Sequence, residues 1–388
     1  MTAWMVIFSV AVFMVFFAMV GYPLLLIAID KVKRPSKLAT NDAYEPTVSY
    51  MIVAHDEEKV IEEKLNNAIQ IDYPMTKFDI VVASDNSTDS TNEIVEQFIK
   101  EHPDHQIRLV CSKEHKGKTN AQNETQKTVH SEILVMTDAN TMLKKDAIRE
   151  LISRFVSDEI VYVCGQLVYE NAESSTTSDS ESMYWNIDLK MRDIESRIHT
   201  ITAGNGAIYA CRNNEYVDFD PIKCHDISMP YYFSTHNKRA VFAPEAIATE
   251  KAGETNGDEF KRKVRMNRDI LDLVADGIKV LNVFRYKWFS IFYFGHRTSR
   301  YTLWLWHALA FIASFVLACM GEKFGMVAVI GQVIGIVFTI CQLKHSSKNK
   351  LIRLIGYYGM TVFAQYVAIY RIITGKAKPV WEKAESTR

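Results

Sequence analysis

The 388-residue sequence has few cysteines, almost no net charge and none of the common glycine-rich nucleotide motifs. Its six cysteines form no C-x-x-C pair and no zinc spacing, so we expect a reduced, cytosol-facing protein in which cysteine acts as a small apolar residue. A formal net charge of −1 leaves no global basic field for nucleic acid. The glycine spacing of a Walker A loop is absent. Because no expected strand ends in G-x-G-x-x-G, a nicotinamide-binding Rossmann domain is not expected either.

Apolar residues are concentrated toward the two ends of the chain. The stretch from Trp4 to Ile29 carries no charge and exceeds the roughly 20 residues needed to cross a bilayer. No basic residue precedes it and no small-x-small cleavage site closes it, which favours a membrane anchor over a signal peptide. Four basic residues follow between positions 31 and 37, so the positive-inside rule puts the next segment in the cytoplasm.

The carboxyl-terminal part also has the composition of a membrane region. Residues 283–300 are aromatic and basic, which predicts an interfacial helix lying in the membrane plane. Residues 301–320 and 324–343 are expected to form a transmembrane hairpin, followed by a basic cytoplasmic loop. Residues 354–373 are a weaker span, which either crosses the membrane or lies along or re-enters it.

Between these ends, the sequence alternates short apolar runs with helical patterns. Strands are expected at 47–53, 78–83, 107–111 and 133–136, and each is followed by a helical segment. Such alternation predicts an α/β domain with a mostly parallel sheet covered by helices on both faces.

Polar residues follow the expected strands, at the sheet edge where open α/β proteins bind ligands. Asp138 and Asn140 come directly after the fourth strand, and their oxygens suit a divalent cation that carries a diphosphate. Alternatively, they only cap a helix beginning near Leu143. Lys118, in a Gly-Lys pair at a helix start, suits a phosphate. The shared position of these residues with Glu57 and Asp85 favours a nucleotide diphosphate site over separate caps and turns.

Two later segments add candidates. Asp226, next to His225 at an expected helix start, is either a cap or a general base. Arg262 and Arg265 are three residues apart and share a helix face, where they could hold a leaving diphosphate or lie against anionic lipid headgroups.

Taken in order, these segments resemble the membrane-bound family 2 glycosyltransferases, inverting GT-A enzymes that include chitin-, cellulose- and hyaluronan-type synthases and bacterial exopolysaccharide transferases. The likeness runs from Val48 to Lys383. It is carried by the segments VAHDEE (53–58), DNSTD (85–89), GKTNAQN (117–123), TDANT (137–141), GNGAIYACR (204–212), HD (225–226) and FKRKVR (260–265).

The resemblance implies roles for individual residues. Ala54, His55, Glu57 and Asp85 would hold the nucleoside, and Lys118 would lie near the base or phosphate. Asp138 and Asn140 would bind a divalent metal, Mg²⁺ or Mn²⁺, on the diphosphate. Asp226 would be the catalytic base, and Arg262 and Arg265 would stabilise the leaving nucleotide.

The sequence departs from the family pattern at three places. Asn140 replaces the second Asp of D-x-D, and His225 stands where these enzymes usually have an acid beside the base. Arg262-x-x-Arg265-Met266 lacks the Gln and Trp of Q-x-x-R-W. The changes at Asn140 and His225 keep open one alternative to a transferase, a silent nucleotide-sugar-binding membrane partner. A processive synthase that also translocates its polymer is the other alternative, and the missing Trp of Q-x-x-R-W, which helps hold the acceptor in processive synthases, counts against it.

The implied protein is a multi-pass bacterial plasma-membrane enzyme with its catalytic domain in the cytoplasm. It would move a sugar, UDP-linked first, to a lipid-linked or polysaccharide acceptor in cell-surface or exopolysaccharide biosynthesis, with membrane lipids and export or polymerisation proteins as partners. The expected organisation is an anchor (1–30), a linker (31–46), a GT-A domain (47–282), an interfacial segment (283–300), a transmembrane region (301–373) and a basic tail (374–388).

Overall fold

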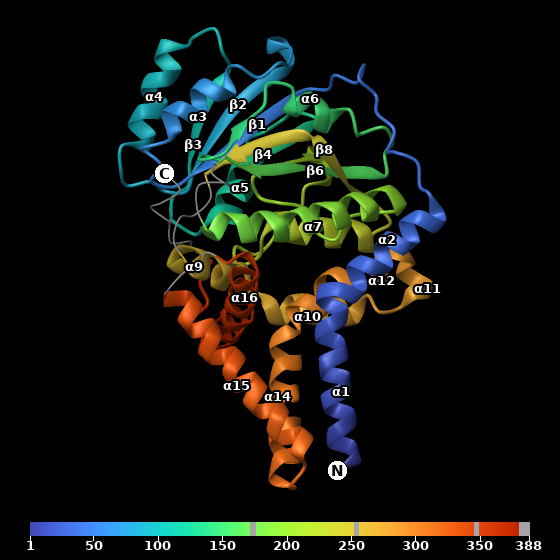
Figure 1. The fold of residues 1–388 in the computed structure, drawn as a ribbon. Helices are drawn as coiled ribbons and strands as arrows, with labels where there is room; N and C mark the ends of the chain where they lie inside the picture. The colour runs from blue at the N-terminus through green and yellow to red at the C-terminus, as the bar shows by residue number, and fades with distance from the viewer. Residues whose placement is uncertain (171–175, 252–255, 345–348, 380–388) are drawn as a thin grey trace. The chain divides into compact units, whose positions relative to one another are not determined.

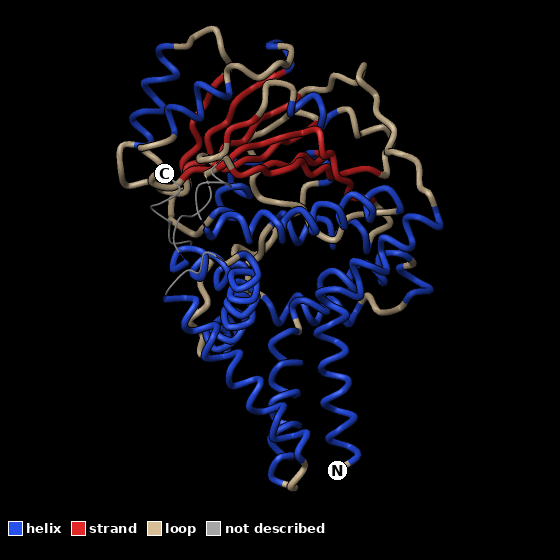
Figure 2. The backbone as a smooth tube through the Cα atoms, in the orientation of Figure 1, coloured by secondary structure: helices blue, strands red, loops and turns tan. Residues whose placement is uncertain are grey.

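The computed structural model describes residues 1–170, 176–251, 256–344 and 349–379. The chain divides into two compact units. One unit contains residues 35–170 and 192–252 and holds every strand of the described residues, whereas the other contains residues 1–34, 171–191 and 253–377 and is helical (Figure 2). Among the described elements, helix α7 (Thr176–Ile198) passes from one unit to the other.

The strand-containing unit is built on one eight-stranded sheet of order β3-β2-β1-β4-β7-β6-β8-β5. Strands β1 to β4 pair in parallel with one another, β7 is antiparallel to both β4 and β6, and β8 is parallel to β6. The strands are β1 (Val48–Ala54), β2 (Phe78–Ser84), β3 (Ile107–Cys111), β4 (Ile133–Asp138), β5 (Met142–Leu143), β6 (Ile160–Tyr169), β7 (Ile208–Arg212) and β8 (Arg239–Glu250).

Helices cover both faces of this sheet. Figure 1 shows α3, α4 and α6 on one face and α5 on the other. Every residue of β1 is buried, as expected for a central strand of such a sheet. The helices of this unit are α3 (Ile61–Ala68), α4 (Thr91–Glu101), α5 (Lys118–Gln126), α6 (Ala147–Ile152) and α8 (His225–Thr235), with short 3₁₀ turns at Met75–Lys77 and Asn213–Glu215.

The register of the first four strands decides where the site lies. Ala54 at the end of β1 is opposite Ser84 at the end of β2, and Ser84 is opposite Cys111 at the end of β3. Val53 is opposite Asp138, the last residue of β4. The carboxyl ends of four parallel strands therefore meet in one row, and the polar residues that follow them gather at one edge.

The second unit consists of helices. They are α1 (Thr2–Phe16), a π-helical turn (Phe17–Gly21), α2 (Tyr22–Lys33), α9 (Asn256–Met266), α10 (Ile270–Lys279), α11 (Val283–Tyr286), α12 (Trp288–Phe292), a π-helical turn (Tyr293–Thr298), α13 (Ser299–Tyr301), α14 (Leu303–Cys319), α15 (Lys323–Lys344) and α16 (Lys350–Ile373).

Two helices of the described residues are long and apolar enough to cross a membrane, Thr2–Lys33 and Lys323–Gln342. Trp288–Tyr301 and Leu303–Cys319 also qualify when the two are counted as one span with a 58° bend. At this bend, Gln365 of α16 donates to Arg300 O at 2.8 Å and accepts from Trp304 N at 3.1 Å. This glutamine therefore pairs two backbone groups at the junction of two helices, which explains a buried amide in an otherwise apolar helix.

Three local expectations differ from the structure. The helix expected from Leu143 begins only at Ala147, because Met142 and Leu143 pair with β8. Asp138 and Asn140 therefore do not cap α6. The single helix expected over 283–300 is broken at Lys287, whose φ is +51°. Strand β8, the longest of the sheet, is not among the expected strands. Residues 380–388 of the expected basic tail lie outside the described residues.

Candidate active site

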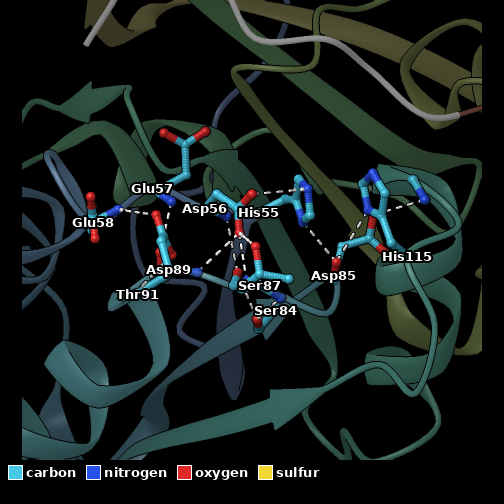
Figure 3. A network of polar contacts seen from close by, with 12 residues as sticks. His55, Asp56, Glu57, Glu58, Ser84, Asp85, Ser87, Asp89, Thr91 and His115 are labelled. Atoms are coloured by element: carbon cyan, nitrogen blue, oxygen red, sulfur yellow. Dashed lines mark hydrogen bonds and ion pairs between the residues drawn. The ribbon is translucent and has the colours of Figure 1, made fainter.

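The loops after β1 and β2 are tied together by a network of acidic side chains (Figure 3). Asp56, with φ +49°, accepts hydrogen bonds from Thr88 N at 2.6 Å and Asp89 N at 3.4 Å. Asp89 accepts from Glu58 N at 3.2 Å, and Ser90 N donates back to Glu58 at 3.1 Å. These carboxylates are engaged with backbone N–H groups, so their evident task is to fix the shape of the two loops.

Asp85 connects the end of β2 to the loop before α5. Its carboxylate is fully buried and accepts from Gly117 N at 2.7 Å, Lys116 N at 3.1 Å and His115 Nδ1 at 2.7 Å. The close approach of Gly117 uses φ +97°, which only glycine adopts readily. The Asp85 side chain has no exposed surface, so its carboxylate holds the His115 ring and the loop before α5 in place.

The imidazole rings of His55 and His115 stack above Asp85, with centroids 3.6 Å apart and planes inclined by 11° (Figure 3). With Asp85 they form a group whose ligand atoms are close enough for a metal ion. The stacking opposes that use, because a metal lies near the plane of each imidazole that binds it and two parallel rings cannot share such a plane. A flat aromatic surface next to the ends of β1 and β2 instead suits stacking against a nucleobase.

Three further side chains meet around Gly206, beyond the end of β4. Lys118 Nζ forms an ion pair with Asp138 and donates to Gly206 O at 2.8 Å. A methyl group added at Gly206 would lie 2.9 Å from Lys118 Nζ, 3.8 Å from Asp138 Oδ2 and 3.9 Å from Asp226 Cγ. The side chains of Lys118, Asp138 and Asp226, which are distant in the sequence, therefore face one small volume.

Asp226 lies in the first turn of α8, and its carbonyl oxygen accepts from Gly204 N at 2.7 Å. The neighbouring His225 points into the protein, where its Nδ1 is 2.9 Å from Gln122 Oε1 and its Nε2 is 3.2 Å from Val217 O. Burial lowers the pKa of His225 to about 3, so its imidazole is neutral at neutral pH.

A neutral imidazole has one N–H and cannot donate to two carbonyl oxygens. We infer that the Gln122 amide is turned, so that its Nε2 donates to His225 Nδ1 and its Oε1 accepts from the hydroxyl of Tyr209, which lies 2.9 Å from the Gln122 amide. His225 is then a neutral, buried residue whose hydrogen bonds to Gln122 and Val217 hold the start of α8, and it does not act as a second acid beside Asp226.

Asp138 and Asn140 supply a carboxylate and an amide, the oxygen donors that Mg²⁺ and Mn²⁺ prefer. Asn140 Nδ2 donates to Glu250 Oε1 at 2.8 Å, which adds a second carboxylate beside this pair. The donor chemistry of these residues therefore fits a divalent cation.

Lys64 is a neighbour of this segment that sequence reasoning missed. It is fully buried on α3, and its Nζ donates to Thr137 Oγ1 at 3.2 Å and to Thr141 O, the residues on either side of Asp138-Ala139-Asn140. Burial lowers the pKa of Lys64 to about 7, against the raising effect of the Asp138 charge. A signal was available, because Lys64 lies three residues after Ile61 and four before Ala68, on the buried face of the helix.

The structure thus brings eight sequence-predicted residues to one sheet edge: Ala54, His55, Glu57, Asp85, Lys118, Asp138, Asn140 and Asp226. Arg262 and Arg265 belong to the helical unit. There, Arg262 forms a bidentate ion pair with buried Glu259, at 2.7 and 3.1 Å, and Tyr357 of α16 donates to the same carboxylate at 3.2 Å. The role of these arginines at the diphosphate stays a prediction.

This combination of fold and polar edge defines a class of protein. The chain aligns with the mannosyltransferase PcManGT from Pyrobaculum calidifontis, solved in complex with GDP-Man and Mn²⁺. The TM-score is 0.72, with 95% of this chain and 99% of that chain covered at 20% sequence identity. This likeness shows that the fold is that of the GT-A glycosyltransferases.

The family follows from the sequence match. The model of the family described as glycosyltransferase-like family 2 matches residues 46–268, more than half of the chain. The protein therefore belongs to glycosyltransferase family 2 and is a glycosyltransferase.

Curated relatives include enzymes of two kinds. The chain is 25% identical over 224 residues to the poly-beta-1,6-N-acetyl-D-glucosamine synthase of Staphylococcus epidermidis, with 56% of this chain and 53% of that one covered. It is 24% identical over 144 residues to the beta-monoglucosyldiacylglycerol synthase of a Nostoc strain, with 37% and 31% covered. The chain spans about half the length of the first of these relatives and less of the second. It is thus similar to both polysaccharide and glycolipid synthases.

Proposed function

We propose that the protein is a membrane-anchored inverting glycosyltransferase that moves a sugar from a nucleotide sugar, UDP-linked first, to a lipid-linked or polysaccharide acceptor. The observation that carries this proposal is the meeting of Lys118, Asp138 and Asp226 around Gly206. A cation, a carboxylate fit for a metal-bound diphosphate and a second carboxylate fit for a base are the groups that such a transfer requires.

In the proposed mechanism, Asp226 accepts the proton of the acceptor hydroxyl as that oxygen attacks the anomeric carbon of the donor. The bond from that carbon to the diphosphate breaks, so the configuration inverts in one displacement and no enzyme nucleophile is needed. A divalent metal held by Asp138 and Asn140 would neutralise charge on the diphosphate when bound. Lys118, Arg262 and Arg265 are the proposed residues that would stabilise the leaving nucleotide.

At the nucleoside end, Ala54, His55, Glu57 and Asp85 are the proposed binding residues. The stacked rings of His55 and His115 support this assignment, because they provide an aromatic face at the ends of β1 and β2. His115 is not among the residues predicted from sequence, and its contact with Asp85 adds it to the proposed nucleoside site.

The proposed location is a bacterial plasma membrane, with several crossings and the catalytic unit in the cytoplasm. Two helices with the composition of membrane spans and the basic cluster at 31–37 support it. The domain boundaries given from the sequence are part of this proposal. Export or polymerisation proteins of exopolysaccharide biosynthesis are the proposed partners.

One observation favours a second candidate function. The similarity to a poly-N-acetylglucosamine synthase supports a processive enzyme that repeats the transfer and translocates its product. Such an enzyme makes a polymer from donor alone, whereas a single-addition transferase needs an added lipid or glycan acceptor.

The test is nucleotide release by the detergent-purified full chain, with a panel of nucleotide sugars, Mg²⁺ or Mn²⁺, and membrane lipid extract as acceptor. We expect metal-dependent release from one donor, lost in Asp226→Asn while donor binding persists. Asp218→Asn is the matched control, because Asp218 is an exposed carboxylate that pairs with Lys127. Equal release by Asp226→Asn would remove Asp226 as the base, and donor binding without release under all conditions would support a silent binding protein.

A further inference from the structure

A carboxylate not predicted from the sequence fixes the amide of Asn140. Asn140 Nδ2 donates to Glu250 Oε1 at 2.8 Å. Within the described residues, Asn140 Oδ1 accepts no hydrogen bond, so the amide carbonyl is available as a ligand atom. The contact joins residues 110 positions apart in the chain.

Sheet register puts these two residues together. Strand β5 is antiparallel to the end of β8, with Met142 opposite Thr249 and Leu143 opposite Ala248. Continuing this register by one or two residues carries the chain to Asn140 on one side and Glu250 on the other. The pairing of the two-residue strand β5 with β8 therefore places Glu250, at the end of β8, next to Asn140.

We propose that Glu250 is a positioning residue of the divalent-cation site, and that it provides the negative charge that Asn140 lacks. This inference rests on the proposed function, in which Asp138 and Asn140 bind the metal. Hydrogen bonds from outside the ligand set commonly orient metal ligands, and their loss costs about 10- to 100-fold in metal affinity. Here the bond from Nδ2 holds the amide with Oδ1 free for the cation, and the Glu250 carboxylate favours positive charge nearby.

Glu250→Gln tests this directly, because it keeps the shape and removes the charge. We would measure Mn²⁺ binding to the full chain by the electron paramagnetic resonance of free Mn²⁺, with and without UDP. The expected result is a dissociation constant about tenfold higher than in the native protein. Glu245→Gln on the same strand is the matched control, since Glu245 is an exposed carboxylate that pairs with Arg154.

A charge swap separates positioning from general damage. In the double variant Asn140→Asp/Glu250→Gln, the amide introduced at position 250 can donate to the carboxylate introduced at position 140, so Mn²⁺ affinity should recover to within about threefold of the native value. Mn²⁺ binding by Glu250→Gln within about twofold of the Glu245→Gln control, or a double variant no tighter than Glu250→Gln, would overturn the inference. Thermal unfolding of the metal-free variants checks that folding is intact.

Failure of this inference is distinguishable from failure of the proposed function. If Glu250→Gln binds Mn²⁺ normally and Asp226→Asn still abolishes transfer, only the role of Glu250 is wrong. If the native protein binds no Mn²⁺ even with UDP, the proposed metal site and the role of Glu250 are both wrong.

Discussion

Replacing Lys64 by methionine should make the protein more stable near pH 7 and leave its stability almost unchanged near pH 9. Burial lowers the pKa of this lysine from 10.5 to about 7 in the folded protein. Between these values the unfolded chain binds a proton that the folded chain does not, so stability rises with pH across this window and is constant outside it. Below pH 7 the lowered pKa of Lys64 destabilises the folded protein by its full amount, about 5 kcal/mol at 1.36 kcal/mol per pKa unit.

This destabilisation of the folded protein by Lys64 becomes smaller as the pH rises above 7. At pH 7 about 4 kcal/mol of it remains, and at pH 9 about 2 kcal/mol. Methionine removes the penalty but leaves the acceptors at Thr137 and Thr141 without a donor, which costs about 2 kcal/mol at any pH. Lys64→Met should therefore gain about 2 kcal/mol at pH 7 and about nothing at pH 9.

The assay is the thermal unfolding midpoint in detergent at a fixed scan rate, read at pH 7 and pH 9. A gain of about 2 kcal/mol corresponds to roughly 4–8 °C for a domain of this size. The rate of sugar transfer should fall, because the segment that carries Asp138 loses its two hydrogen bonds from Lys64. Lys59→Met is the control, since Lys59 is exposed. A midpoint difference that is the same at both pH values would refute the reasoning about Lys64.

Three more predictions follow from the site. Gly206→Ala should move Lys118 and slow transfer by about 100-fold with an unchanged unfolding midpoint, because its methyl group would lie 2.9 Å from Lys118 Nζ; normal transfer rates would contradict this. His225→Gln should make the free energy of unfolding less sensitive to acid. The pKa of His225 is about 3 in the folded protein and 6.5 in the unfolded chain, so the native protein loses stability as the pH falls from 6.5 toward 3, by about 3 kcal/mol at pH 4.5. The same pH dependence of the unfolding free energy in the variant and the native protein would contradict this prediction. Gly117→Ala should lower the unfolding free energy by about 1–3 kcal/mol and weaken donor binding, measured by calorimetry, because φ +97° disfavours alanine; an unchanged midpoint would show that the loop relaxes.

Local sequence patterns predicted the strands that carry the site because these strands are buried and parallel. The run from Ile133 to Met136 is apolar on both faces, and the structure extends it by two residues to Asp138. Strand β8 has a less regular pattern, with Pro244 and exposed Glu245 in its middle, and it is a strand through its pairing with β6 and β5. The helix expected at 143–151 begins four residues late, at Ala147, because Met142 and Leu143 pair with β8.

What the sequence determined by itself is the class of protein, the order of the four strands that carry the site and most residues of the candidate site. These follow from short-range patterns: apolar runs, their period, and polar residues directly after strands. The tertiary structure decided which of them meet. Lys64 reaches Thr137 across 73 positions, Glu250 reaches Asn140 across 110, and His225 turns inward to Gln122 across 103. Such contacts depend on sheet register and on burial, which act between distant segments, so a local reading of the chain does not contain them.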